Sequence, residues 1–329
     1  MKKHVELPLG EPFYTTYHNQ AAAMAPAAGN PSIRNWCLNQ VMQLECNRRF
    51  QWGFTTPEAG VTDSHWNKMT CLDVKEFDPW YLKGYINPVI RELLDHGYYV
   101  VFSGVDDYYV EGKSWYKERH FDHDGVICGY DQEDKTYCIY AYDSNWICQK
   151  FWTSQKGFNR GREVVKEKGG YQALFGIKAR NSIVEFSPET VLQKLGEYLD
   201  SSMWKYPPEE EGKVYGIVVQ EYLAKYVGRL YDGAIPYPHM DRRVFRIVWE
   251  HKKGMLERIR CLEEALGWEP EFSREYEPLV READTMRMLY ASHHMHRRDS
   301  VLPIIQKKMW MIREKEEELL TKIVKKGTR

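Results

Sequence analysis

The sequence predicts an α+β protein with two domains, the first mixing strands with helices and the second helical. Up to about residue 180 the chain is rich in Gly, Tyr, Trp and short β-branched runs, which is typical of strands and turns. Beyond about residue 187 the apolar residues recur mostly at helical spacing. At roughly 150 residues per domain, a chain of 329 residues is expected to form two. We place these domains at 1–185 and 187–329.

The first stretches of the chain predict a loop followed by a helix. Residues 14–31 are polar, alanine-rich and broken by proline and glycine, so we expect mostly loop. Residues 36–50 then run without Gly or Pro and carry apolar residues that would form one buried side. Asn35 is a suitable N-cap for this helix. That start places Cys37 in the first helical turn.

The next segments predict a helix and three strands. Residues 87–96 should form a helix that ends at Gly97, and residues 98–102 a strand. Two further strands are expected at 125–128 and 136–142. A short polar turn separates them, which predicts a β-hairpin.

The second half predicts a set of helices. Ser187 is a cap and Pro188 the first residue of the first helix. An exposed loop is expected at Pro207-Pro208 and Glu209–Glu211. Further helices are predicted at about 214–230, 241–266, 274–297 and 300–325.

The last predicted helix carries a heptad-like apolar stripe that Glu316 interrupts. Its members are Leu302, Ile305, Met309, Ile312, Leu319 and Ile323. This pattern favours a helix packed on its own domain. A seam between two copies of the chain, giving a homodimer, is the alternative.

Charge and composition exclude several classes of protein. Lys and Arg number 46 and Asp and Glu 47, which gives a net charge of −1 and argues against nucleic-acid binding through bulk charge. No uncharged apolar stretch of about 18 residues is present, so no membrane span is expected. The basic start of the chain lacks the apolar core of a signal peptide, which predicts a cytoplasmic protein. The seven cysteines include no CxxC pair, which argues against a disulfide framework and a cysteine-based zinc site.

Three residues have the pattern of a nucleophilic catalytic triad. His123 begins a predicted strand and Asp143 follows the next one, so an antiparallel pairing can bring them side by side. The acid would then fix the histidine tautomer and stabilise the imidazolium. A thiolate at Cys37 would be stabilised by the helix dipole and by a protonated histidine. The set predicts Cys37 as nucleophile, His123 as base and Asp143 as its orienting acid.

Each of the three residues also has a structural interpretation. Cys37 would be a buried thiol, His123 a polar residue with its hydrogen bonds satisfied, and Asp143 a turn former. His120 is an alternative base. Cys46 is the fallback nucleophile, less suited because it would lie in the middle of the helix, away from its dipole. His120 and His123 with Asp122 and Asp124 could instead bind a metal, although HxxH before a strand is not the helical HExxH arrangement and no third ligand is evident.

The same stretch resembles the butirosin-biosynthesis protein H family. The resemblance rests on a "D-x-Y/Y-Y" strand end followed by "H-x-x-H-x-x-I-x-G-Y-D", and it covers about residues 35–265. In this chain it is carried by Gly97–Phe102, Asp106–Tyr109, Tyr116, His120 and His123–Asp131, and more loosely by Tyr215-Gly216, Asp241–Arg243, Glu250–Met255 and Arg258-Ile259.

This resemblance implies a papain-like cysteine-protease fold with an additional C-terminal helical domain. It implies a cysteine-dependent acyltransferase or amide synthetase of nonribosomal peptide or polyketide assembly, similar to the amide synthetase of closthioamide assembly. An acyl group would move from a phosphopantetheine thioester on an acyl or peptidyl carrier protein, through Cys37, to a small-molecule amine. No bound cofactor is expected. The alternatives are a peptidase or thioesterase with the same triad, and a non-catalytic relative that only binds the carrier protein.

Overall fold

The computed structural model describes residues 2–24, 30–48, 50, 57–62, 64–201 and 212–328. The chain divides into two compact units. The first unit holds Met1–Arg34 and Ser64–Val184, and the second holds Asn35–Asp63 and Glu185–Arg329. The segment 35–63, which we expected in the first domain, therefore belongs to the second unit by its contacts. The loop expected at Pro207–Glu211 lies outside the described residues.

The first unit is built on an antiparallel sheet of seven strands. Six of them lie in the order β4-β9-β5-β6-β7-β8, and β1 pairs with β6. Their bounds are β1 His4–Glu6, β4 Leu72–Phe77, β5 Tyr99–Asp106, β6 Asp122–Asp131, β7 Thr136–Tyr142, β8 Cys148–Ser154 and β9 Ala173–Ala179. The α+β class is confirmed by this sheet and its helices.

The predicted hairpin is confirmed as β6 and β7, which pair from Val126 with Tyr140 to Asp131 with Thr136. The strand predicted at 98–102 is β5, and it continues four residues further. A bulge at Gly104 makes this continuation possible. Gly104 has a φ of +73°, and a Cβ there would lie 2.0 Å from the carbonyl oxygen of Tyr171. Only glycine fits this position.

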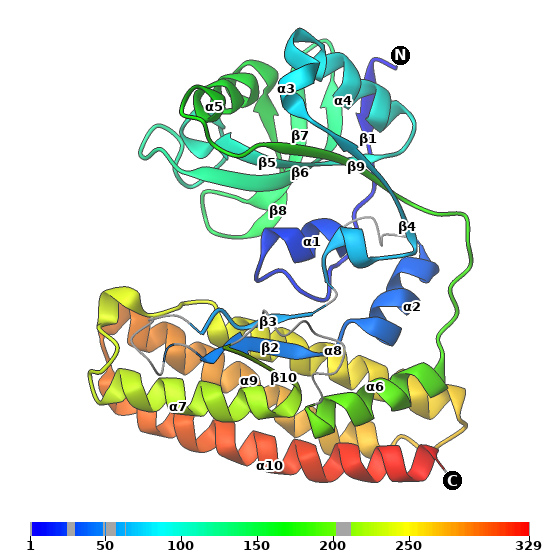
Figure 1. The fold of residues 1–329 in the computed structure, drawn as a ribbon, viewed down its shortest axis with the longest axis vertical. Helices are drawn as coiled ribbons and strands as arrows, with labels where there is room; N and C mark the ends of the chain where they lie inside the picture. The colour runs from blue at the N-terminus through cyan, green and yellow to red at the C-terminus, as the bar shows by residue number, and fades with distance from the viewer. Residues whose placement is uncertain are drawn as a thin grey trace. The chain divides into compact units, whose positions relative to one another are not determined.

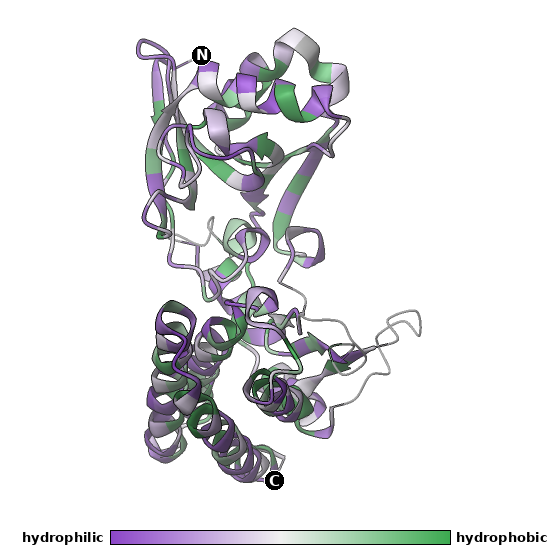
Figure 2. Ribbon diagram, turned by 90° about the vertical axis from the view of Figure 1, so that its left-hand side faces the viewer, coloured by the Kyte–Doolittle hydropathy of each residue, from purple (hydrophilic) through white to green (hydrophobic). Residues whose placement is uncertain are grey.

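Helices cover both faces of the sheet. Helices α3 (Pro79–Leu82), α4 (Ile86–Asp95) and α5 (Gln155–Glu167) lie on one face, and α1 (His18–Met24) lies on the other (Figure 1). The strands of this sheet carry both hydrophobic and hydrophilic residues (Figure 2), and β5 is buried over Tyr99–Phe102 without alternation, because both faces of the sheet are covered. The helix predicted at 87–96 is confirmed as α4. The loop predicted at 14–31 is wrong in part, because the side chains of 20–24 are buried and stabilise α1.

Helix α2 starts earlier and ends earlier than the sequence indicated. It spans Pro31–Gln40, with proline at its first position and the Asn30 side chain accepting a hydrogen bond from the Ser32 N–H. Asn35 is therefore inside the helix and is not its cap. Residues 44–47 form strand β2 (Leu44–Asn47) in place of the expected helix. Strand β2 lies between β3 (Gly60–Val61) and β10 (Lys213–Tyr215) in a small sheet of the second unit.

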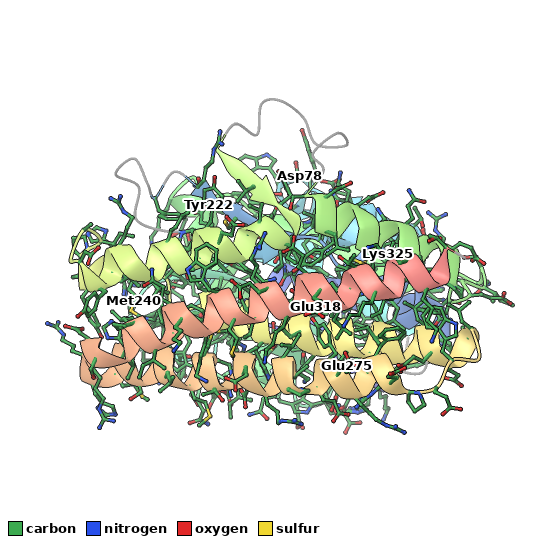
Figure 3. All side chains as sticks on the ribbon, turned by 90° about the horizontal axis from the view of Figure 1, so that it is seen from below. Asp78, Tyr222, Met240, Glu275, Glu318 and Lys325 are labelled. Atoms are coloured by element: carbon green, nitrogen blue, oxygen red, sulfur yellow. The ribbon has the colours of Figure 1, made fainter. Side chains whose placement is uncertain are left out.

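Apart from the small sheet and the end of α2, the described part of the second unit consists mainly of the helices α6 to α10. Ser187 caps the first of them and Pro188 is at its start, as predicted. Helix α10 lies alongside α7 and α9 (Figure 3). The bounds are α6 Pro188–Asp200, α7 Val219–Tyr231, α8 Val244–Ala265, α9 Glu271–His296 and α10 Leu302–Gly327.

The apolar stripe of α10 is part of the core of its own unit. All six of its members are at most 5% exposed. The interruption, Glu316, is itself fully buried, at 0% exposure. Packing on its own unit is therefore the interpretation that the structure supports for this stripe. No helix within the described ranges is both long and apolar enough to cross a membrane.

Candidate functional site

Two histidine–carboxylate pairs lie where β5 ends and β6 begins. The strands are antiparallel, so Asp106 at the end of β5 and Asp107 directly after it come close to His120, just before β6, and His123, the second residue of β6. The Nδ1 atom of His123 lies 2.7 Å from Oδ2 of Asp107. The Nδ1 atom of His120 lies 2.7 Å from Oδ2 of Asp106. Neighbouring acids thus hold neighbouring histidines.

The carboxylate of Asp107 also holds a buried cation. The Nζ atom of Lys113 lies 3.3 Å from Oδ1 of Asp107, and both side chains are almost fully buried. Burial lowers the pKa of Lys113, and the negative charge of Asp107 opposes this shift. A buried ion pair of this kind fixes the orientation of the carboxylate. Asp107 is therefore held on one side by Lys113 and presents its other oxygen to His123.

A third histidine, His18, covers the ring of His123. Their ring centroids are 4.7 Å apart. The Nε2 atom of His18 accepts a hydrogen bond of 3.1 Å from the Tyr142 N–H, so its ring proton lies on Nδ1. Burial lowers the pKa of His18 well below its usual value, and the charges of Lys113 and His123 add to this effect. His18 is therefore neutral at pH 7.

The second ring nitrogen of His123 has the properties of a proton acceptor. The side chain is 25% exposed, and within the described residues nothing forms a hydrogen bond to its Nε2 atom. With Nδ1 donating to Asp107, Nε2 carries the lone pair. A histidine held in this way can remove a proton from a thiol or an amine and stabilise the resulting imidazolium.

The His120 pair is more open to solvent. The His120 side chain is 51% exposed, and its ring stacks on that of Tyr108 with the ring centroids 4.4 Å apart. Asp106 is also occupied by two backbone donors, the N–H groups of Tyr108 and Phe121. The geometry favours His123 over His120 as the base, because His123 is the more enclosed ring and its acid pairs with the buried Lys113. The lysine that lies 3.8 Å from Asp106, Lys168, is exposed.

Asp143 does not orient His123 in the structure. Its carboxylate accepts hydrogen bonds from the N–H groups of Asn145 and Ile147 and from the amide of Gln149. Burial alone would raise the pKa of Asp143. These hydrogen bonds together outweigh burial, so the pKa is lowered from its usual value. The carboxylate that contacts the His123 ring is that of Asp107, and Asp143 stabilises the turn after β7.

Cys37 lies in the second unit, in the interior of α2, whereas His123 lies in the first unit. The prediction that Cys37 lies in the first helical turn is wrong, because α2 begins at Pro31, six residues before Cys37. The Cys37 residue is 1% exposed. Its carbonyl oxygen accepts a hydrogen bond of 2.9 Å from Arg258. The same guanidinium donates to the carbonyls of Leu38, at 2.8 Å, and Val41. Arg258 thus supplies donors to carbonyls at the C-terminal end of α2, among them that of Cys37, which also accepts a hydrogen bond of 3.0 Å from the Val41 N–H.

The fallback nucleophile, Cys46, lies on strand β2 and not in a helix. It is 1% exposed. Burial, together with the neighbouring charge of Glu45, raises the pKa of the Cys46 thiol far above its usual value. A thiol in this state forms little thiolate and is a poor nucleophile.

A buried charge network occupies the centre of the helical unit. The Nζ atom of Lys252 lies 2.6 Å from Oε2 of Glu316, and both side chains are fully buried. Glu316 also accepts hydrogen bonds from Tyr198, at 3.1 Å, Gln220, at 2.5 Å, and Tyr276. Every oxygen of this carboxylate is thus paired, which explains why a charge is tolerated in the apolar stripe of α10.

The described residues contain no group of three or more His, Cys, Asp or Glu side chains placed to hold a metal ion. Three of the four residues of the metal alternative make other contacts. His120 and His123 face Asp106 and Asp107, and Asp124 accepts a hydrogen bond of 2.5 Å from Ser103.

The sequence pattern did not identify Asp107, Lys113 or His18 as residues of this site. Asp107 could have been found by the argument that selected Asp143, because an acid at the end of β5 lies as close to the start of β6 as an acid at the end of β7. Lys113 lies in a loop, and His18 lies in α1, a helix that the sequence did not indicate. No local signal therefore pointed to either residue.

Comparison with models of known protein families gave no match to this chain. A search of curated proteins gave no match either. The resemblance to the butirosin-biosynthesis protein H family therefore rests on the motif residues themselves.

Proposed function

We propose that this protein is a cysteine-dependent acyltransferase that moves an acyl group from a carrier-protein thioester to a small-molecule amine. The observation that carries the proposal is the ring of His123, held by Asp107 at 2.7 Å with its Nε2 atom unbonded among the described residues. The papain-like fold, the role in natural-product assembly and the roles of Cys37, the phosphopantetheine thioester and the carrier protein rest on the motif resemblance alone.

The proposed reaction has two half-reactions. In the first, His123 accepts the thiol proton of Cys37, the thiolate attacks the thioester carbonyl, and the pantetheine thiol leaves with that proton. In the second, a neutral amine attacks the acyl group on Cys37. His123 then accepts the N–H proton and returns it to the sulfur of Cys37 as the amide leaves.

Asp107 supports both half-reactions without touching the substrate. It stabilises the imidazolium of His123 each time the ring accepts a proton. Lys113 keeps this carboxylate in place by pairing with its second oxygen. A thioester is already activated, so a thiolate and a positioned base are sufficient for its cleavage, and transfer to an amine then requires that the amine compete with water.

Intact-mass spectrometry with an acyl-pantetheine thioester tests the covalent step. The wild-type protein and Cys46→Ala should gain the mass of one acyl group, and Cys37→Ala should not. Adding a primary amine should then release an amide faster than free acid forms. An adduct that persists in Cys37→Ala would overturn the role of Cys37, and faster release of free acid would indicate a thioesterase or peptidase.

A second candidate, a non-catalytic protein that binds the carrier, is favoured by one observation. Cys37 is 1% exposed and lies in a helix whose carbonyls Arg258 holds. A thiol in that position should react slowly with iodoacetamide at neutral pH. Slow alkylation combined with no acyl adduct, while holo-carrier protein still binds, would support this candidate over the enzyme.

A further inference from the structure

A hollow of about 450 Å³ lies in the first unit, and the histidine–carboxylate pairs do not line it. It lies between the end of β4, the start of α3 and the segment that joins α5 to β9. The side chains that matter for its chemistry are those of Glu76, Asp78, Trp80, Lys166 and Tyr171. A volume of this size is within the range of small-molecule sites.

Two walls of the hollow are exposed aromatic rings. The Trp80 residue is 58% exposed and Tyr171 is 74% exposed. Large aromatic side chains dominate cores and interfaces because burying them is favourable, and exposed ones at a hollow mark a binding surface. The faces of these rings carry negative potential, which attracts cations.

Two carboxylates at the hollow add negative charge. Glu76 and Asp78 are both exposed, and within the described residues neither forms an ion pair with a lysine or an arginine. An oxygen of Asp78 accepts a hydrogen bond of 2.8 Å from the Trp80 N–H, which fixes its place at the start of α3. The hollow therefore combines aromatic faces with carboxylates that lack a cationic partner.

The protein already places one cation against this surface. The Nζ atom of Lys166 lies 4.2 Å from the centre of the Trp80 ring. Lys166 is long and flexible, so a ligand cation can replace it on the ring. This contact indicates which kind of group the Trp80 face accepts.

We propose that the hollow binds an organic ammonium ion carried on an apolar body. The ammonium takes the place of Lys166 against Trp80, close to Glu76 and Asp78, and the apolar body lies against Tyr171. The inference rests on residues of the first unit only, and it holds whether or not the protein transfers acyl groups.

Titration calorimetry of the full-length protein with phenethylamine tests the proposal. Its uncharged analogue, 2-phenylethanol, is the matched ligand control and should bind at least about fivefold more weakly. Trp80→Ala should raise the Kd for phenethylamine about fivefold. Tyr81→Ala should leave the Kd unchanged, because Tyr81 is 79% exposed on the same helix and does not line the hollow.

Two further variants test the charges. Glu76→Gln should weaken binding of phenethylamine, and Lys166→Met should strengthen it, because the internal competitor is removed. All of these side chains are exposed or at the surface, so the variants should retain the far-UV circular dichroism of the wild type. Equal binding of the two ligands, an unchanged Kd in Trp80→Ala, or weaker binding in Lys166→Met would each overturn the proposal.

Discussion

The Nδ1 atom of His123 lies 2.7 Å from a carboxylate oxygen of Asp107, while the other oxygen of that carboxylate is paired with buried Lys113. Asp106 and Asp107, where β5 ends, thus form parallel pairs with His120 and His123, which lie just before and within the start of β6. Only the His123 pair is anchored by a buried lysine and covered by a neutral histidine, His18. This difference is the basis for assigning the base to His123.

Asp107 should act as a positioning residue. We expect Asp107→Asn to lower the rate of acyl transfer about 10²- to 10⁴-fold, because the amide does not stabilise the imidazolium and can hold the wrong tautomer. Asp143→Asn should change the rate much less, since its carboxylate serves only its own turn. Rates measured from pH 6 to 9 check this, and the account fails if Asp143→Asn, at an unchanged melting temperature, has the larger effect.

The pair of Lys252 and Glu316 should stabilise the helical unit only when both are present. Lys252→Met leaves a buried carboxylate without its cation, and we expect the free energy of unfolding to fall by about 3–5 kcal/mol. The double variant Lys252→Met, Glu316→Leu should lose less than the sum of the two single variants. Urea unfolding followed by circular dichroism measures all three. Strict additivity of the single effects would contradict the assigned ion pair.

Arg258 should stabilise the end of α2 and protect Cys37. Arg258→Met removes the guanidinium donor from the carbonyls of Cys37, Leu38 and Val41, of which Cys37 keeps the Val41 N–H, and each carbonyl left unpaired costs about 1–3 kcal/mol. Arg260→Met is the matched control on the same helix. Its exposed ion pair with Glu277 contributes at most about 1 kcal/mol. Urea unfolding and the rate of Cys37 alkylation should both change in Arg258→Met only, and equal effects of the two variants would contradict this role.

His251 should make the protein less stable in acid. Burial and the charge of Lys252 lower the pKa of His251 well below 6.5, while the hydrogen bond to the Met42 carbonyl opposes the shift. Below pH 6.5 the unfolded chain therefore binds the proton and the folded chain does not. The free energy of unfolding should fall by about 1.4 kcal/mol per pH unit from this residue alone.

Urea unfolding at pH 7 and pH 5.5 measures that dependence. His251→Gln should reduce the loss of stability in acid, whereas His96→Gln, at an exposed position, should leave it unchanged. An acid dependence that is the same in the wild type and in His251→Gln would show that His251 is protonated in the folded protein.

The sequence predicted elements whose signals are local. The cap at Ser187, the proline at its helix start and the β6–β7 hairpin depend on residues within a few positions of one another, and all three are confirmed. The helix at 36–50 was wrong because burial in the small sheet of the second unit decides the state of 44–47, and the partner strand β10 is far along the chain.

The candidate site was predicted only in part for the same reason. His123 was found from its place before a strand, but its acid depends on which neighbouring strand supplies the carboxylate. Asp107 and Asp143 were equally compatible with the sequence pattern, and the backbone donors around Asp143 decide between them. The interruption of the α10 stripe by Glu316 was visible, but its four partners lie on other helices.

The most direct test of the account compares His123→Asn with His120→Asn in amide formation from an acyl-pantetheine thioester and a primary amine. The two residues form the same kind of pair, so each variant controls for the other. We predict that His123→Asn lowers the rate at least about 100-fold and that His120→Asn stays within about threefold of the wild type. A larger loss in His120→Asn, with both variants folded, would contradict the assignment of His123 as the base.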